Sequence, residues 1–76
     1  MKFDKTSKNR YGTFTCHFGF YPKQQTLTLW TDGVCNYLSM FIPCSSEQQM
    51  SNIVSIVLSS IENNVDTTEE DIMAKL

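Results

Sequence analysis

The sequence contains little of the chemistry that most catalytic and metal sites require. Its 76 residues include a single histidine, His17, and three cysteines, Cys16, Cys35 and Cys44. Their spacing lacks the close cysteine pairs that hold structural zinc, so we expect no metal and no cofactor. The three glycines are scattered singly, which argues against a glycine-rich phosphate loop. Because a catalytic site needs several such groups converging, we expect that this protein is not an enzyme.

Long apolar runs are also missing. The longest, IVSIVL, falls far short of the roughly 20 residues that a membrane-spanning helix needs. The first ten residues, MKFDKTSKNR, are polar and do not have the pattern of a signal peptide. Without a leader, an odd number of cysteines favours reduced thiols over a disulfide framework. We therefore expect a cytoplasmic protein without a membrane partner.

The composition is that of one small globular domain covering residues 1–76, with 41% hydrophobic and 12% aromatic residues. A core of this size rarely supplies more than about 3–5 kcal/mol, which favours association with a partner or a second copy. Charge is unevenly placed: residues 1–23 carry five basic side chains against one acid, and residues 24–76 carry seven acids against one lysine. This polarity can steer docking, although ordinary solvated charge also explains it.

Alternating residues between positions 11 and 42 predict an antiparallel sheet. Two strands are expected before Asp32-Gly33, a dipeptide typical of a two-residue hairpin turn. That turn would place Leu27 opposite Leu38 in a third strand, which ends at Pro43. Residues 4–10, DKTSKNR, lack periodicity, so we expect residues 1–10 to form a flexible arm, although the initial MKF could add a short edge strand to the sheet.

Two helices are expected after the strands. A main helix over residues 46–63 begins with Ser46 and Gln49 at capping-box spacing. Its apolar stripe consists of Met50, Ile53, Val54, Val57, Leu58 and Ile61. A short helix over residues 67–76 follows, with Ile72, Met73 and Leu76 as its apolar side. The fold class is therefore α+β: a three-stranded antiparallel meander packed against one long helix, followed by a short C-terminal helix in a two-layer sandwich.

One long helix covers one face of such a sheet and leaves the question of what covers the other. The second face should collect His17, Tyr21, Trp30, Tyr37 and Phe41 among threonines. Large aromatics on neighbouring strands approach the size of patch that marks a binding site, and Trp and Tyr are enriched at interface hot spots. Four occupants remain open: the C-terminal helix or N-terminal arm, a second copy, a different protein, or a nucleic acid.

Nucleic-acid binding has a clear mechanism. Bases of a single strand would stack on Tyr21, Trp30 and Tyr37. The phosphates would be held by a clamp of basic residues from the first part of the chain, Lys5, Lys8, Arg10 and Lys23. Against this stands a pI near 5.1, where a nucleic-acid-binding domain usually has a basic excess.

Cys44 precedes the predicted main helix, where a helix N-terminus can lower the pKa of a thiol. The only base that could assist it is His17. A small residue at the junction of a strand and a helix is the simpler interpretation.

Binding to a larger protein is the function that these features favour. The expected partner-binding residues are Tyr21, Trp30, Tyr37, Phe41 and Ile56, the last because it lies off the helix stripe. In size, free cysteines and lack of a catalytic set, the chain resembles small phage-encoded inhibitors of host machinery, including anti-CRISPR proteins. The resemblance is one of format and covers no motif. It implies a stoichiometric inhibitor acting in the host-cell cytoplasm, with a homodimer as a further expectation.

Overall fold

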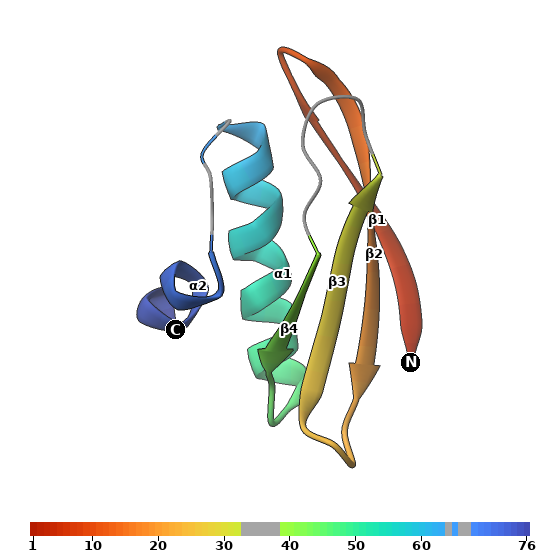
Figure 1. The fold of residues 1–76 in the computed structure, drawn as a ribbon, viewed down its shortest axis with the longest axis vertical. Helices are drawn as coiled ribbons and strands as arrows, with labels where there is room; N and C mark the ends of the chain where they lie inside the picture. Colours follow the sequence, from red (N-terminus) through yellow and green to blue (C-terminus); the bar gives the residue numbers. More distant parts are fainter. Residues whose placement is uncertain (33–38, 64, 66–67) are drawn as a thin grey trace.

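The protein folds into a sheet with two helices on one side (Figure 1). The computed structural model describes residues 1–32, 39–63, 65 and 68–76. The strands are β1 (Lys2–Asn9), β2 (Gly12–Tyr21), β3 (Thr26–Asp32) and β4 (Ser39–Pro43), and the helices are α1 (Glu47–Glu62) and α2 (Glu69–Lys75). The sheet is antiparallel, with the order β1-β2-β3-β4. The predicted α+β class is confirmed, with one strand more than expected.

The additional strand is β1, and the flexible arm expected over residues 1–10 is wrong. β1 pairs with β2 along its length, from Lys2 opposite Gly19 to Asn9 opposite Gly12. Asn9 Oδ1 accepts a hydrogen bond from the backbone N–H of Tyr11 at 2.8 Å and so closes the turn. Gly12 has a φ of 136°, a conformation that favours glycine.

The pairing of β3 with β4 differs from the predicted hairpin by four positions. Leu27 lies opposite Ile42, where the Asp32-Gly33 turn required Leu38. A shift by an even number of residues leaves every side chain on its predicted face, so Leu27 and Ile42 still point toward the helices. The predicted opposition of Leu27 and Leu38 is therefore wrong. Residues 33–38, which contain Gly33, lie outside the described residues.

Helix α1 begins and ends where the sequence predicts. Ser46 is its N-cap and accepts a hydrogen bond from the backbone N–H of Gln49 at 3.2 Å. Gln49 Oε1 accepts a hydrogen bond from the backbone N–H of Ser45 at 2.7 Å. In a regular capping box this bond would come from the N-cap residue itself, which is Ser46. At the other end, Asn63 donates from its side-chain amide to the Ser59 carbonyl at 2.8 Å. These local contacts explain why the helix could be located from sequence.

Helix α2 is anchored by a single fully buried residue. Thr68 and Asp71 form a complete capping box, and the hydrogen bonds from Thr68 hold the pKa of the Asp71 carboxyl below its usual value. Ile72 is 0% exposed, whereas Met73 and Leu76, the other residues of the predicted apolar side, are exposed. The short helix therefore adds one side chain to the core.

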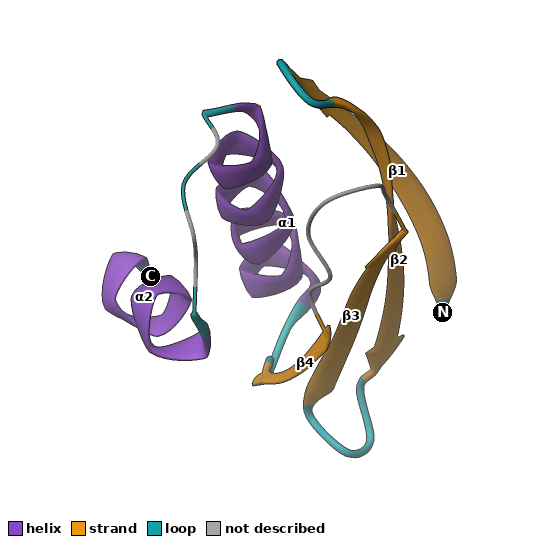
Figure 2. Ribbon diagram, turned by 45° about the horizontal axis from the view of Figure 1, so that its top comes forward, coloured by secondary structure: helices purple, strands orange, loops and turns teal. Residues whose placement is uncertain are grey.

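Both helices lie on the same side of the sheet, as Figures 1 and 2 show. The core between the layers consists of Cys16, Phe18, Phe20, Leu27, Leu29, Ile42, Cys44, Ile53, Val54, Val57 and Ile72. Within the described ranges, neither helix is long and apolar enough to cross a membrane.

Burial raises the pKa of the Cys16 thiol from 9.0 to about 11. The contribution of Cys16 to the free energy of unfolding should therefore be fully retained below pH 9 and fall between pH 9 and 11, because the unfolded thiol ionises there and the folded one does not. The loss attributable to Cys16 has an upper limit of about 3 kcal/mol. Urea titrations of wild type and Cys16→Val across this range measure it, since valine removes the ionisation. Parallel pH profiles for the two proteins would contradict this expectation.

Candidate binding surface

The face of the sheet opposite the helices, called the open face here, is defined by alternation with the buried side chains. Phe14, Cys16 and Phe18 point toward the helices, so their neighbours in β2 point away. Across the four strands, the described side chains that the register places on the open face are Lys2, Asp4, Thr6, Lys8, Thr13, Thr15, His17, Tyr21, Thr26, Thr28, Trp30, Asp32, Phe41 and Pro43.

Two large aromatic side chains are exposed on this face. Trp30 is 44% exposed and Phe41 is 68% exposed. Phe41 lies opposite Thr28, two residues from Trp30, so the two rings are diagonal neighbours on β3 and β4. Tyr21 is half-buried on β2, and the predicted Tyr37 lies outside the described residues. The open face thus presents a pair of adjacent aromatic rings.

Neither the C-terminal helix nor the N-terminal segment covers the open face. Helix α2 lies on the helix side of the sheet, with Ile72 in the core, and residues 2–9 are a strand of the sheet itself (Figure 2). Intramolecular cover by either segment, which the sequence left open, is therefore contradicted.

Trp30 is held in place by a neighbouring histidine. The His17 ring stacks on the Trp30 indole, with ring centroids 4.2 Å apart and 25° between the planes. His17 Nδ1 lies 2.8 Å from Asp4 Oδ1, so a carboxylate on β1 fixes the imidazole from the other side. Its Nε2 is buried and has no hydrogen-bond partner among the described residues. The arrangement orients Trp30.

A shallow hollow lies beside this stack. Gly19 forms part of it, and a side chain there would come within 3.1 Å of Tyr21 Cε2 and Oη and 2.7 Å of Thr28 Oγ1. The absence of a Cβ lets the Tyr21 ring lie against the sheet. The hollow measures about 320 Å³ and is lined by Lys2, Asp4, His17, Phe18, Gly19, Tyr21, Thr28 and Trp30. It can accept a side chain of a partner next to the indole.

Sequence reasoning missed Asp4 and Lys2 as parts of this surface. A hairpin pairing across Arg10-Tyr11 would have placed both on the open face, since they alternate with Phe3. The signal was weak because an edge strand at the rim of a sheet buries few side chains.

The basic clamp predicted for nucleic acid is not brought together. Lys5 lies opposite Cys16 and therefore points to the helix face, away from Trp30. Arg10 stacks on Tyr11 at 5.0 Å in the β1–β2 turn, whereas Lys23 lies in the β2–β3 turn at the other end of β2. Of the four residues, Lys8 alone has a position on the open face.

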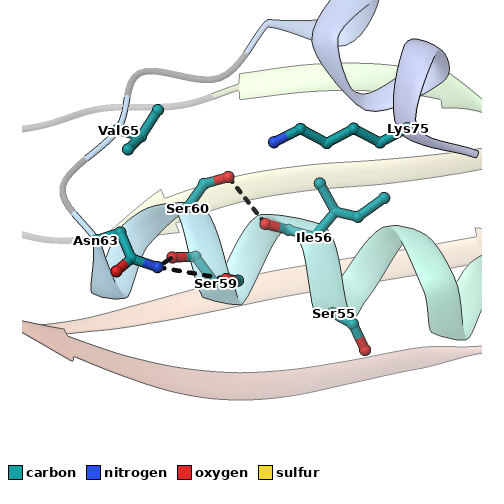
Figure 3. Close-up of a pocket in the computed structure, with 7 residues that line it drawn as sticks. All are labelled: Ser55, Ile56, Ser59, Ser60, Asn63, Val65 and Lys75. Atoms are coloured by element: carbon teal, nitrogen blue, oxygen red, sulfur yellow. Dashed lines mark hydrogen bonds between the residues drawn. The ribbon is translucent and has the colours of Figure 1, made fainter.

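Ile56 also lies on a different surface from Trp30. It lines a groove of about 320 Å³ between α1 and the C-terminal segment, together with Ser55, Ser59, Ser60, Asn63, Val65 and Lys75 (Figure 3). Because α1 packs on the helix face, one flat contact cannot include both Ile56 and Trp30.

Cys44 does not have the properties of an activated nucleophile. It is 1% exposed, and burial raises the pKa of its thiol. The thiol donates a hydrogen bond to the Ser46 carbonyl at 3.4 Å. It belongs to the core on the helix side, and His17 points to the open face. Among the residues with described positions, no three His, Cys, Asp or Glu side chains gather as metal ligands would.

No protein-family model, curated protein or solved structure matches this chain.

Proposed function

We propose that the protein is a small, non-enzymatic binding module that docks its open face on a larger protein partner. The observation that carries the proposal is the exposure of Trp30 and Phe41, side by side on a sheet face that neither helix covers. Aromatic side chains of this kind bury roughly 150–250 Å² each on contact, and they dominate interface energetics.

The preorganised position of the Trp30 ring also supports a binding role. The stack on His17 and the bond from His17 to Asp4 restrict the Trp30 ring before any partner arrives. A side chain that is already ordered loses less entropy on binding, roughly 0.5–1.5 kcal/mol per immobilised side chain. The charges on the open face around Trp30 suit a protein partner. Two basic side chains, Lys2 and Lys8, are balanced there by two acidic ones, Asp4 and Asp32.

A stoichiometric inhibitor of host machinery, the role implied by the phage-type format, is the finer form of the proposal. Such an inhibitor needs a rigid contact surface and no chemistry of its own. The same format includes anti-CRISPR proteins.

The test is partner capture from the native host with wild type, Trp30→Ala and Tyr11→Ala in parallel, followed by titration of the captured protein against each variant. Tyr11 is the matched control, because it is 49% exposed in the β1–β2 turn. We expect Trp30→Ala to weaken binding at least thirtyfold, corresponding to about 2 kcal/mol, with an unchanged thermal midpoint. Tyr11→Ala should bind like wild type. A Trp30→Ala variant that binds normally, or that unfolds, would show that the contact lies elsewhere.

Binding of single-stranded nucleic acid is the alternative on the same face, and the separation of Lys5, Arg10 and Lys23 weakens it. It requires salt-sensitive binding that is lost in Trp30→Ala and reduced in Lys8→Glu. Under the protein-binding proposal, a titration with single-stranded oligonucleotides at low salt is flat.

A further inference from the structure

The outer edge of β1 offers a regular row of backbone hydrogen-bonding groups. The N-terminal amine of Met1 donates to the Phe20 carbonyl at 2.9 Å, and Phe20 N–H donates to the Met1 carbonyl at 2.7 Å. Hydrogen-bonded pairs alternate along an antiparallel ladder, so odd-numbered residues of β1 bond to β2 and even-numbered residues point their N–H and C=O groups outward. These outward residues are Lys2, Asp4, Thr6 and Lys8.

No described residue occupies this edge. β1 is the first strand of the sheet order, and Figures 1 and 2 show no strand or helix beyond it. The opposite edge strand, β4, is shorter and ends at Pro43, which has no N–H to donate. An edge as long and regular as β1 is a template for another strand.

We propose that β1 pairs with β1 of a second copy, antiparallel, around a twofold axis that passes through Thr6. The two four-stranded sheets then form one continuous sheet. This association uses the outer edge of β1, whereas the proposed partner contact uses Trp30 and Phe41 on β3 and β4. It does not depend on the proposed function.

Charge selects the register. Two symmetric registers give the longest overlap, with the axis at Lys5 or at Thr6. An axis at Lys5 places Lys5 opposite Lys5 and Lys2 opposite Lys8, which are repulsive pairs. An axis at Thr6 places Asp4 of each copy opposite Lys8 of the other and Thr6 opposite Thr6. Opposite-charge and Thr–Thr pairs both favour pairing.

The lysines of β1 do not block this register. Lysine on an edge strand ordinarily opposes pairing with another chain. Here Lys8 faces an acid, Lys5 faces the small Ser7, and Lys2 lies beyond the paired residues. Asp4 is 63% exposed beside His17, so its carboxylate remains accessible from the edge.

An apolar groove beside the edge adds contact area for the second copy. It measures about 460 Å³ and is lined by Phe3, Lys5, Met50, Ser51, Val54, Ser55 and Leu58. At the other end of β1, Ser7 Oγ donates to the Leu58 carbonyl at 3.1 Å and Asn9 Nδ2 to the Ile61 carbonyl at 3.0 Å, so the last turns of α1 lie over that end.

The Thr6 register brings these two features together. It places Phe3 opposite Asn9 of the second copy, so the groove of one copy faces the last turns of the other copy's α1. That segment carries the exposed Glu62, which complements Lys5 at the groove. Because the twofold axis is perpendicular to the sheet, both Trp30 side chains lie on one surface, which allows bivalent binding.

The test is the molar mass of the full chain in solution, by sedimentation equilibrium over a range of concentrations, for wild type, Asp4→Lys and Lys8→Asp. Wild type should be a dimer. Each single variant places like charges opposite each other twice in its own dimer, and we expect its dimer dissociation constant to rise at least tenfold. An equimolar mixture of the two variants restores both attractive pairs and should form a heterodimer.

A backbone substitution tests the edge itself. Thr6→Pro removes an outward N–H and leaves the ladder to β2 intact, so we expect a folded monomer. Thr6→Val keeps the N–H and should remain dimeric. A wild-type protein that is monomeric at every concentration overturns the proposal, as does a mixture of Asp4→Lys and Lys8→Asp that stays monomeric.

Discussion

Ile42→Ala is expected to abolish most of the stability of the domain, whereas Phe41→Ala on the same strand leaves it nearly unchanged. Ile42 is 0% exposed and lies opposite Leu27 in the core. Replacing a buried isoleucine by alanine costs about 2–5 kcal/mol, through lost burial and the cavity left behind. A core of this size supplies about 3–5 kcal/mol in total. Urea unfolding followed by circular dichroism measures the loss.

The adjacent residue supplies the control. Phe41 is 68% exposed, and truncation of an exposed side chain changes the free energy of unfolding by about 0.5 kcal/mol or less. The pair of variants therefore tests which face of β4 is inside. Equal losses from Ile42→Ala and Phe41→Ala would mean that the open face is covered and is not available to a partner.

Ile72→Ala is expected to release helix α2 from the core. Ile72 is the only residue of this helix among the described buried residues, at 0% exposed. A helix that spans only Glu69–Lys75 is too short to persist in water without packing. Loss of the isoleucine side chain costs about 2–5 kcal/mol, and we expect the backbone amides of α2 to exchange with solvent as in an unfolded peptide. Hydrogen exchange measured by NMR follows each amide.

Met73→Ala is the matched control for this second experiment, since Met73 is 42% exposed on the same helix. It should retain the exchange rates and the urea midpoint of the wild type. If Ile72→Ala kept α2 protected, the capping box of Thr68 and Asp71 would have to hold the helix without its core contact.

The helices and their caps were predictable because the relevant contacts are local. Ser46 and Gln49 lie within one helical turn. The apolar stripe of α1 follows from the spacing of hydrophobic residues within one short segment of the sequence. The alternation of β3 and β4 likewise assigned Trp30 and Phe41 to one face and Leu27 and Ile42 to the other. The predicted faces are correct although the predicted register of β3 with β4 is wrong, because the two registers differ by an even number of residues.

The edge strand and the candidate site could not be read from sequence in the same way. β1 is identified by its hydrogen bonds to β2, not by its own side chains, since Lys2, Asp4 and Lys8 face solvent. Without β1, nothing indicated that Asp4 reaches His17 or that His17 supports Trp30. The separation of Ile56 from Trp30 likewise depends on how α1 packs on the sheet.

By itself, the amino-acid sequence determined which residues are helical, which alternate, and which side of each central strand is apolar, because those properties depend on neighbours a few positions away. Only the tertiary structure decided the pairing of β1, the register of β4 and the support of Trp30 by His17 and Asp4. These features depend on contacts between segments far apart in the chain. Several strand pairings satisfy the same local sequence pattern, and the packing of the helices and the sheet determines which pairing forms.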